Sequence, residues 1–196
     1  MHAPKWKLFS VLWAVTVALW VLPYVIDRFG SLDLKNAFTG YPWNFSPMYA
    51  VALFGGAFLR NRTVAVALPV VAYAGVNLAI WALSGKLSYA AHPVVWICYA
   101  LYALIPAFGF GLETQEAPLR SALGRSFAAA VMFFALSNLA VFAFEPIYAK
   151  TLAGLGDCFY QALPFFPATL GSTVLFTGAL FSPVGLKLAT QPAVKA

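Results

Sequence analysis

Apolar residues occur along this chain in runs that are too long for ordinary strands. The first run begins just after Lys5 and Lys7 and continues to Asp27. As a helix, a run of this length matches the ~30 Å hydrocarbon thickness of a bilayer. Five further apolar runs follow, separated by polar or aromatic connectors. We therefore predict an all-α membrane protein, a six-transmembrane-helix bundle with spans at about 8–26, 47–59, 64–83, 93–112, 126–144 and 168–186.

Composition agrees with a chain that is surrounded by lipid. Hydrophobic residues make up 62% of the sequence and charged residues only 9%, with a mean hydropathy of +0.82. Soluble domains carry about 25% charged residues, so this chain cannot cover a water-facing surface. No polar linker divides it, and we expect one integral membrane domain over residues 1–196, with a tail beyond 186 that has no regular structure.

The net charge of +6 is best interpreted as a topology signal. In a soluble protein it would suggest nucleic acid, but here the basic residues lie between apolar runs, so no nucleic-acid partner is expected. Cytoplasmic connectors are enriched in Lys and Arg. Placing both termini inside gives eight inner basic residues against four outer ones: Lys5, Lys7, Arg60, Arg62, Arg120, Arg125, Lys187 and Lys195 against Arg28, Lys35, Lys86 and Lys150. We predict an N-in, C-in protein of a cell membrane, and the family resemblance described below implies the bacterial inner membrane.

Two connectors on the predicted outer side are long. Residues 27–45 contain an aromatic cluster, and residues 146–167 are more polar, with a short interfacial helix expected over 151–163. Long ordered connectors are often functional. We therefore expect any ligand site at the outer face, beneath these two segments.

The predicted spans contain no Asp, Glu, Lys, Arg or His in their cores. Ionisable residues inside membranes mark proton relays and ion pathways, so their absence argues against a proton-coupled pump. The sequence has no H-E-x-x-H, P-loop or G-x-S-x-G motif, and we expect no metal, no cofactor and no enzyme activity. A lipid-modifying enzyme would depend on Glu145 or Asp157, the only acids late in the chain on that side.

Several polar and aromatic residues are candidate ligand contacts. Asn77 and Asn138 lie within spans, where they either form interhelical hydrogen bonds or contact a bound molecule. Aromatic residues near span ends, Trp20 among them, are typical of an interfacial belt. For Trp43, Tyr148 and Tyr160, which lie in the two long connectors, stacking on a ligand is the alternative.

Two regions resemble a family of bacterial membrane proteins. They are residues 42–57, PWNFSPMYAVALFGGA, and the segment from Asn138 that includes Tyr148, residues 151–155, Cys158, residues 164–166 and residues 169–171. That family is similar to the substrate-binding (S) components of energy-coupling-factor (ECF) vitamin transporters. The resemblance implies six helices, an outer-facing small-molecule site and a cytoplasmic ATPase module that drives transport.

The resemblance also implies particular residues. S components present an A-x-x-x-A face on the first helix to a transmembrane partner, and Ala14 and Ala18 match that pattern. Arg60 and Arg62 would face the cytoplasm and the partner. Family members often carry Asp at the positions of Asn77 and Ser172, so this chain has either lost what those acids bind or changed its ligand.

The resulting hypothesis is a vitamin-like solute-binding membrane component of an uptake transporter, energised by a partner ATPase. The alternative is a structural or accessory subunit of a larger membrane complex. Copurification distinguishes them, because stoichiometric protein partners without a ligand would favour the structural role. The expected ligand-binding residues are Trp43, Asn44, Asn77, Asn138, Tyr148, Asp157 and Tyr160.

Overall fold

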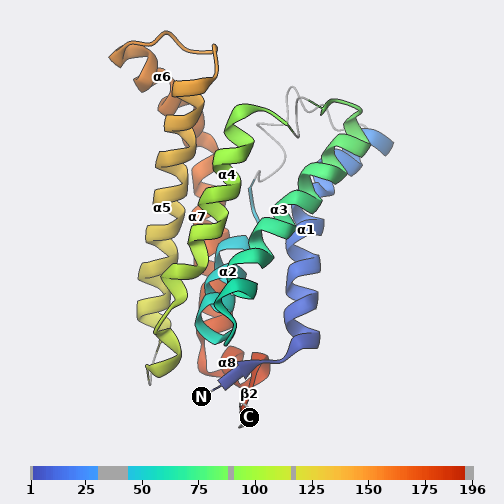
Figure 1. Cartoon of the computed structure of the whole chain (residues 1–196), viewed down its shortest axis with the longest axis vertical. Coiled ribbons are helices and arrows are strands. Elements are labelled where there is room, and N and C mark those ends of the chain that lie inside the picture. Colours follow the sequence, from blue (N-terminus) through green and yellow to red (C-terminus); the bar gives the residue numbers. More distant parts are fainter. Residues whose placement is uncertain (1, 31–43, 88–90, 116–117, 193–196) are drawn as a thin grey trace.

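The computed structural model describes residues 2–30, 44–87, 91–115 and 118–192. Most of these residues are helical, and the strands among them form one short β-ribbon at the termini (Figure 1). The helices are α1 (Trp6–Phe29), α2 (Met48–Phe58), α3 (Arg62–Ser84), α4 (Pro93–Leu104), α5 (Leu119–Phe144), α6 (Leu152–Ala162), α7 (Phe166–Phe181) and α8 (Pro183–Ala189), with 3₁₀ turns η3 (Ile105–Gly109), η4 (Leu112–Thr114) and η5 (Leu163–Phe165), and the strands are β1 (His2–Pro4) and β2 (Thr190–Pro192).

Five helical segments of the described chain are long and apolar enough to cross a membrane. They are α1, α3, the segment Pro93–Thr114, α5 and the segment Leu152–Phe181. The prediction of an all-α membrane protein is therefore confirmed. The predicted span at 47–59 forms only α2, which has 11 residues. At 1.5 Å per residue, α2 covers about half the thickness of a bilayer.

Helix α2 is short because of the residues at its two ends. Asn44 adopts φ 64°, a left-handed conformation that turns the chain before the helix begins. Ser46 then accepts a hydrogen bond from the backbone N–H of Met48 at 3.3 Å. After α2, Asn61 caps α3 by accepting from the backbone N–H of Val64 at 3.2 Å. Figure 1 shows α2 inside the lower half of the bundle.

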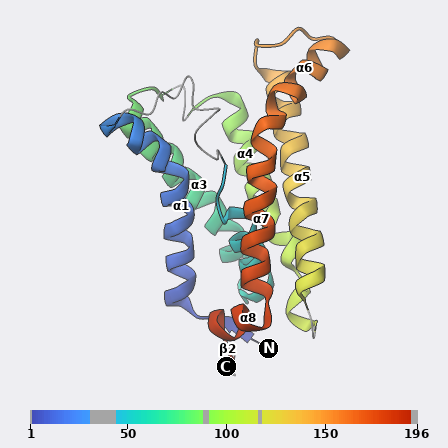
Figure 2. The ribbon, with the colours of Figure 1, turned by 180° about the vertical axis from the view of Figure 1, so that it is seen from behind.

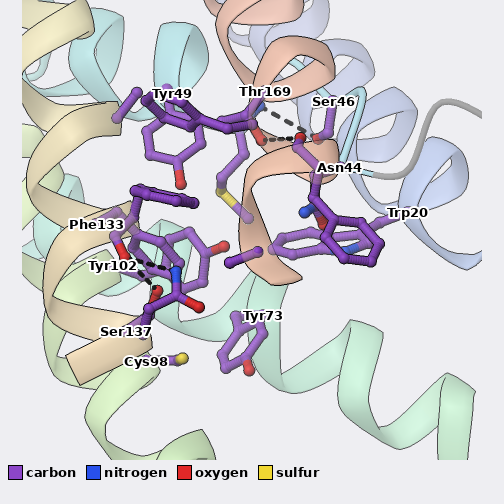
Figure 3. A pocket seen from close by; sticks show the side chains of 17 residues that line it. Trp20, Asn44, Ser46, Tyr49, Tyr73, Cys98, Tyr102, Phe133, Ser137 and Thr169 are labelled. Carbon is purple, nitrogen blue, oxygen red and sulfur yellow. Dashed lines mark hydrogen bonds between the residues drawn. The ribbon is translucent and has the colours of Figure 1, made fainter. Parts of the chain in front are cut away.

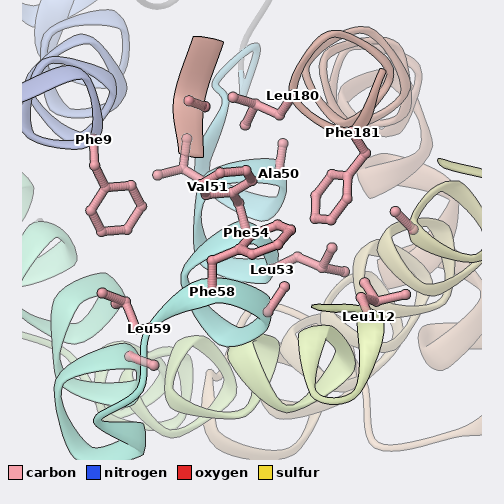
Figure 4. Close-up of a cluster of buried hydrophobic side chains, with 14 residues drawn as sticks. Phe9, Ala50, Val51, Leu53, Phe54, Phe58, Leu59, Leu112, Leu180 and Phe181 are labelled. Carbon is pink, nitrogen blue, oxygen red and sulfur yellow. The ribbon is translucent and has the colours of Figure 1, made fainter. Parts of the chain in front are cut away.

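Helix α2 is the centre of the core, since all 11 of its residues are buried. Phe54 packs against Phe58 in a tilted arrangement and against Phe181 edge-to-face, with ring centroids 4.7 and 5.6 Å away (Figure 4). Gly56 and Gly109 allow α2 to touch η3 directly. A Cβ atom at Gly56 would overlap the carbonyl oxygen of Pro106, and one at Gly109 would overlap that of Leu53. Helix α2 therefore forms the centre of the hydrophobic core in the lower half of the bundle.

The two chain termini lie together at one end of the molecule (Figures 1 and 2). Strand β1 pairs antiparallel with β2, and Lys5 donates its backbone N–H to the carbonyl of Ala189 at 2.7 Å. The expectation of an unstructured tail is therefore wrong for β2. Helix α8 turns the chain sideways after Ser182, which brings the last described residues beside the first. We call this end of the bundle the terminal end and the other the distal end.

Basic residues gather at the terminal end, where Glu113 is the only acid among the described residues. Arg62 donates to the carbonyl of Gly56, pairs with Glu113 at 3.3 Å and lies 4.3 Å from the ring centroid of Phe110. Arg125 donates to the carbonyl of Phe110 at 2.7 Å. Two of the terminal-end arginines therefore bind the chain's own backbone. The basic residues at this end are Lys5, Lys7, Arg60, Arg62, Arg120, Arg125 and Lys187.

Candidate functional site

A cavity of about 240 Å³ lies above the N-terminus of α2, and we call it the central cavity (Figure 3). Residues from all seven helices α1 to α7, from η5 and from the segment before α2 line it. None of the lining side chains is charged. Its rings and neutral polar groups are Trp20, Tyr49, Tyr73, Tyr102, Phe133, Phe134, Phe165 and Phe166, with Asn44, Ser46, Ser137, Asn138 and Thr169, and Met48, Cys98, Ala130 and Ala162 complete the lining.

Tyr102 is the centre of an aromatic cluster that forms one wall of the central cavity. Its ring centroid lies 4.5 Å from Phe133, 4.8 Å from Tyr73 and 5.6 Å from Trp20. Tyr49 lies at the N-terminus of α2 and reaches Phe133 edge-to-face at 5.9 Å. Aromatic pairs at these spacings hold one another in place. A flat ring that enters the cavity therefore meets a preformed aromatic surface.

Neutral polar groups also line the cavity. Asn138 donates its side-chain N–H to the carbonyl of Phe134 at 2.7 Å, and Thr169 donates its hydroxyl to Phe165 at 3.3 Å. In both bonds the side chain is the donor, so the amide oxygen of Asn138 and the hydroxyl oxygen of Thr169 can still accept a hydrogen bond from a ligand. A few fixed polar groups in an apolar pocket are the usual source of ligand orientation.

A second, more open cavity of about 520 Å³ lies at the surface of the distal end beside α6, and we call it the distal cavity; its lining residues Ile147 and Gln161 are exposed. It shares Asn138, Ala162 and Phe165 with the central cavity, so these three residues form the wall between the two. The thiol of Cys158 donates to the backbone carbonyl of Asn138 at 3.4 Å and fixes α6 to α5. The remaining lining residues are Val141, Ile147, Tyr148, Cys158 and Gln161.

The structure brings three of the expected ligand residues to the two cavities. Asn44 and Asn138 line the central cavity, and Asn138 and Tyr148 line the distal one. Trp43 lies outside the described residues. Asn77 is buried behind the cavity wall, where it donates its amide N–H to the carbonyl of Tyr73 at 3.0 Å. Its geometry gives it a positioning role for Tyr73.

Asp157 and Tyr160, also expected at the site, line neither cavity. Helix α6 buries Gly154 and Cys158, which are four residues apart and share one face. Asp157 and Tyr160 belong to the other faces, and Tyr160 is 71% exposed. The sequence placed them near the site because they lie in the right connector, but the rotation of α6 turns them away.

The expected partner residues lie on the outside of the bundle. Ala14 and Ala18 belong to the exposed face of α1, opposite the buried Thr16. Arg60 is exposed in the turn before α3. Arg62 differs, because its guanidinium group contacts Gly56, Glu113 and Phe110 of the same chain.

Sequence reasoning missed most of the aromatic wall. Trp20 was expected in an interfacial belt but lies against the cavity, beside Tyr73 and Tyr102. The available signal was the presence of tyrosines in the middle of spans. A tyrosine in hydrocarbon needs a partner for its hydroxyl group, and several such residues in different spans indicate a shared polar interior.

The described residues offer no group of three or more His, Cys, Asp or Glu side chains placed to hold a metal ion. His92 and Glu145 form a pair at 3.1 Å at the distal rim, where they join the start of α4 to the end of α5. Both residues lie outside the lining of the two cavities.

Comparison with known proteins gives one match. No curated protein and no solved structure matches the chain. The sequence model of one family covers residues 2–194, which is nearly the whole chain. The protein therefore belongs to this family, DUF6580, a family of unknown function.

Proposed function

We propose that this protein is the solute-binding membrane component of a small-molecule uptake system and that a partner ATPase module supplies the energy. The observation that carries the proposal is the central cavity. Residues of seven helices and of the segment before α2 line it, most of them with rings or neutral polar groups, and no charged side chain is among them. Pockets that bind small molecules have this composition.

The lining sets the properties of the solute. A charged molecule in this cavity would lose its hydration without gaining an opposite charge, which costs several kcal/mol. The cavity of about 240 Å³ is also smaller than the ~300–1,000 Å³ typical of pockets for drug-sized ligands. The part of the solute held there is therefore small, uncharged and flat enough to lie against Tyr102 and Phe133.

Three further features support a role in uptake. The cavity lies toward the distal end, away from the basic terminal end that the positive-inside rule assigns to the cytoplasm. Ala14 and Ala18 form a small-residue face on α1 that suits close packing by another membrane helix. The sequence resembles ECF S components, which bind a solute while a separate module hydrolyses ATP. A protein of this kind needs no ionisable relay of its own.

The test is native mass spectrometry of the purified protein, followed by thermal unfolding with a panel of uncharged vitamins and nucleosides. We expect a small molecule bound at one per chain, or a rise in Tm with a member of the panel. Ser137→Leu places an isobutyl group into the cavity and should abolish both signals. Ala143→Leu is the matched control, because it introduces the same side chain at an exposed position of α5.

The structural-subunit alternative gives a different result in the same preparation. Stoichiometric membrane partners, no bound small molecule and no thermal shift with any compound would contradict the proposal. Identical behaviour of the Ser137→Leu and Ala143→Leu proteins would show that any bound molecule lies outside the central cavity.

A further inference from the structure

The central and distal cavities are adjacent, and their shared wall is thin. It consists of Asn138 from α5, Ala162 at the end of α6 and Phe165 from η5. Ala162 contributes only a methyl group to this wall. A molecule that passes Asn138 can therefore extend from one cavity into the other.

The two cavities differ in chemistry. The central cavity contains the aromatic cluster around Tyr102 and selects a ring. The distal cavity is lined by the amide of Gln161 and the phenol of Tyr148, with the aliphatic side chains Val141 and Ile147. Amides and phenols both donate and accept hydrogen bonds, so the distal cavity suits a hydroxyl- or amide-bearing chain.

Asn138 is placed to contact a molecule that occupies both cavities. Its side-chain N–H is committed to the carbonyl of Phe134 at 2.7 Å, and its backbone carbonyl accepts from the thiol of Cys158 at 3.4 Å. These two bonds hold the residue in place and leave its side-chain oxygen as the available acceptor at the junction.

Three charged side chains near the distal cavity, Lys150, Glu145 and His92, contact other groups of the chain, and the exposed Asp157 is not among the lining residues. Lys150 donates to the carbonyls of Phe142 and Glu145, the latter at 2.7 Å, and caps the end of α5. The carboxylate of Glu145 pairs with His92. Both cavities are thus lined by uncharged groups alone, and a charged chain would lack a partner in either of them.

We propose that the solute has two parts: a flat uncharged ring in the central cavity and an uncharged hydroxyl- or amide-bearing chain that passes Asn138 into the distal cavity. This inference rests on the proposed function and extends it to the class of solute. It assigns to Tyr148 and Gln161 the selection of the chain, and to the Tyr102 cluster the selection of the ring.

The test compares bare rings with the same rings carrying a hydroxylated chain. The probes are three pairs, adenine and adenosine, uracil and uridine, and lumiflavin and riboflavin, titrated into the full-length protein in detergent. We expect at least one chain-bearing compound to bind about tenfold more tightly than its bare ring, as two added hydrogen bonds would give. Binding is followed by calorimetry.

Variants locate the source of that advantage. The double variant Tyr148→Phe/Gln161→Ala should reduce the tenfold advantage to about twofold or less, while the Kd of the bare ring stays unchanged. Tyr160→Phe is the matched control, because Tyr160 lies on α6 but lines neither cavity. It should keep the full advantage.

Two results would overturn the inference and leave the proposed function standing. One is a bare ring that binds as tightly as its chain-bearing partner. The other is an advantage that survives the double variant. If none of the six compounds binds, the inference is wrong, and native mass spectrometry of the purified protein decides separately whether the proposed function fails with it.

Discussion

Asn44 sets the position at which α2 begins. Among the described residues it is the one non-glycine position with a positive φ, at 64°. Asparagine tolerates this left-handed conformation better than other residues with a Cβ atom, because its short polar side chain bonds locally. The turn directs the chain into the bundle, so that α2 starts beneath the central cavity. Asn44 also lines that cavity, so the proposed function would give it a binding role beside its conformational one.

Two substitutions at this position separate those roles. Asn44→Ala should lower the free energy of unfolding by about 1 kcal/mol, since alanine is disfavoured in the left-handed region. Asn44→Gly keeps the conformation and should unfold within a few degrees of the wild type, yet it should lose solute affinity like the alanine variant. Thermal unfolding in detergent and calorimetry measure the two effects. Equal Tm values for the alanine and glycine variants would contradict the conformational role.

The candidate site was only partly predictable at this scale. Asn44 and Asn138 stood out because a neutral amide in or beside an apolar span is unusual, and both line the central cavity. Trp20 did not, because aromatic residues near span ends are typical of an interfacial belt and the sequence does not indicate which face of an apolar helix turns inward. For the same reason the sequence did not show that Tyr160 lies on a face of α6 that points away from both cavities. Tyr102 was missed although its position in the middle of a span was a usable signal.

The contact between α2 and η3 depends on two glycines. At Gly56 the nearest neighbour to an added Cβ would be the carbonyl oxygen of Pro106, which is backbone and cannot move aside like a flexible side chain. Gly109 is in the same position relative to the carbonyl of Leu53. Such close approach of two backbones is the usual function of small residues between membrane helices. It fixes α2 and hence the floor of the central cavity.

Gly56→Ala should destabilise the protein by about 1–3 kcal/mol or more, because the added methyl group forces the backbones of α2 and η3 apart. Gly75→Ala in α3 is the matched control, since no atom lies within 4 Å of its added Cβ. Gly75→Ala should leave the free energy of unfolding unchanged or raise it slightly. Tm values from tryptophan fluorescence compare the two. Similar Tm values for both variants would show that η3 moves aside at little cost.

At the scale of elements, apolar length predicted the long helices well and the interrupted ones poorly. The spans predicted at 8–26, 64–83 and 126–144 lie within α1, α3 and α5. The span at 93–112 instead changes to 3₁₀ turns around Pro106, and the one at 168–186 breaks at Ser182, which caps α8. Hydropathy does not register such breaks, because the residues on either side remain apolar. For the same reason α2 was predicted as a full span.

Charge distinguishes the two ends of the whole molecule. The distal end has equal numbers of described acids and bases. The acids are Asp27, Glu145 and Asp157, and the bases are Arg28, Lys86 and Lys150. The terminal end has seven basic residues against Glu113. The pairing of β1 with β2 places both termini at this basic end. Together these features favour an orientation with the terminal end in the cytoplasm and the cavities facing outward.

Cysteine labelling tests this orientation directly. In a background with Cys98→Ala and Cys158→Ala, Lys86→Cys places a thiol at the distal end and Arg120→Cys places one at the terminal end, both at exposed positions. A membrane-impermeant maleimide added to intact spheroplasts should label Lys86→Cys at once and Arg120→Cys only after lysis. The reverse pattern would put the cavities on the cytoplasmic side. A solute taken from outside would then have no direct access to them, so the proposed direction of transport depends on this result.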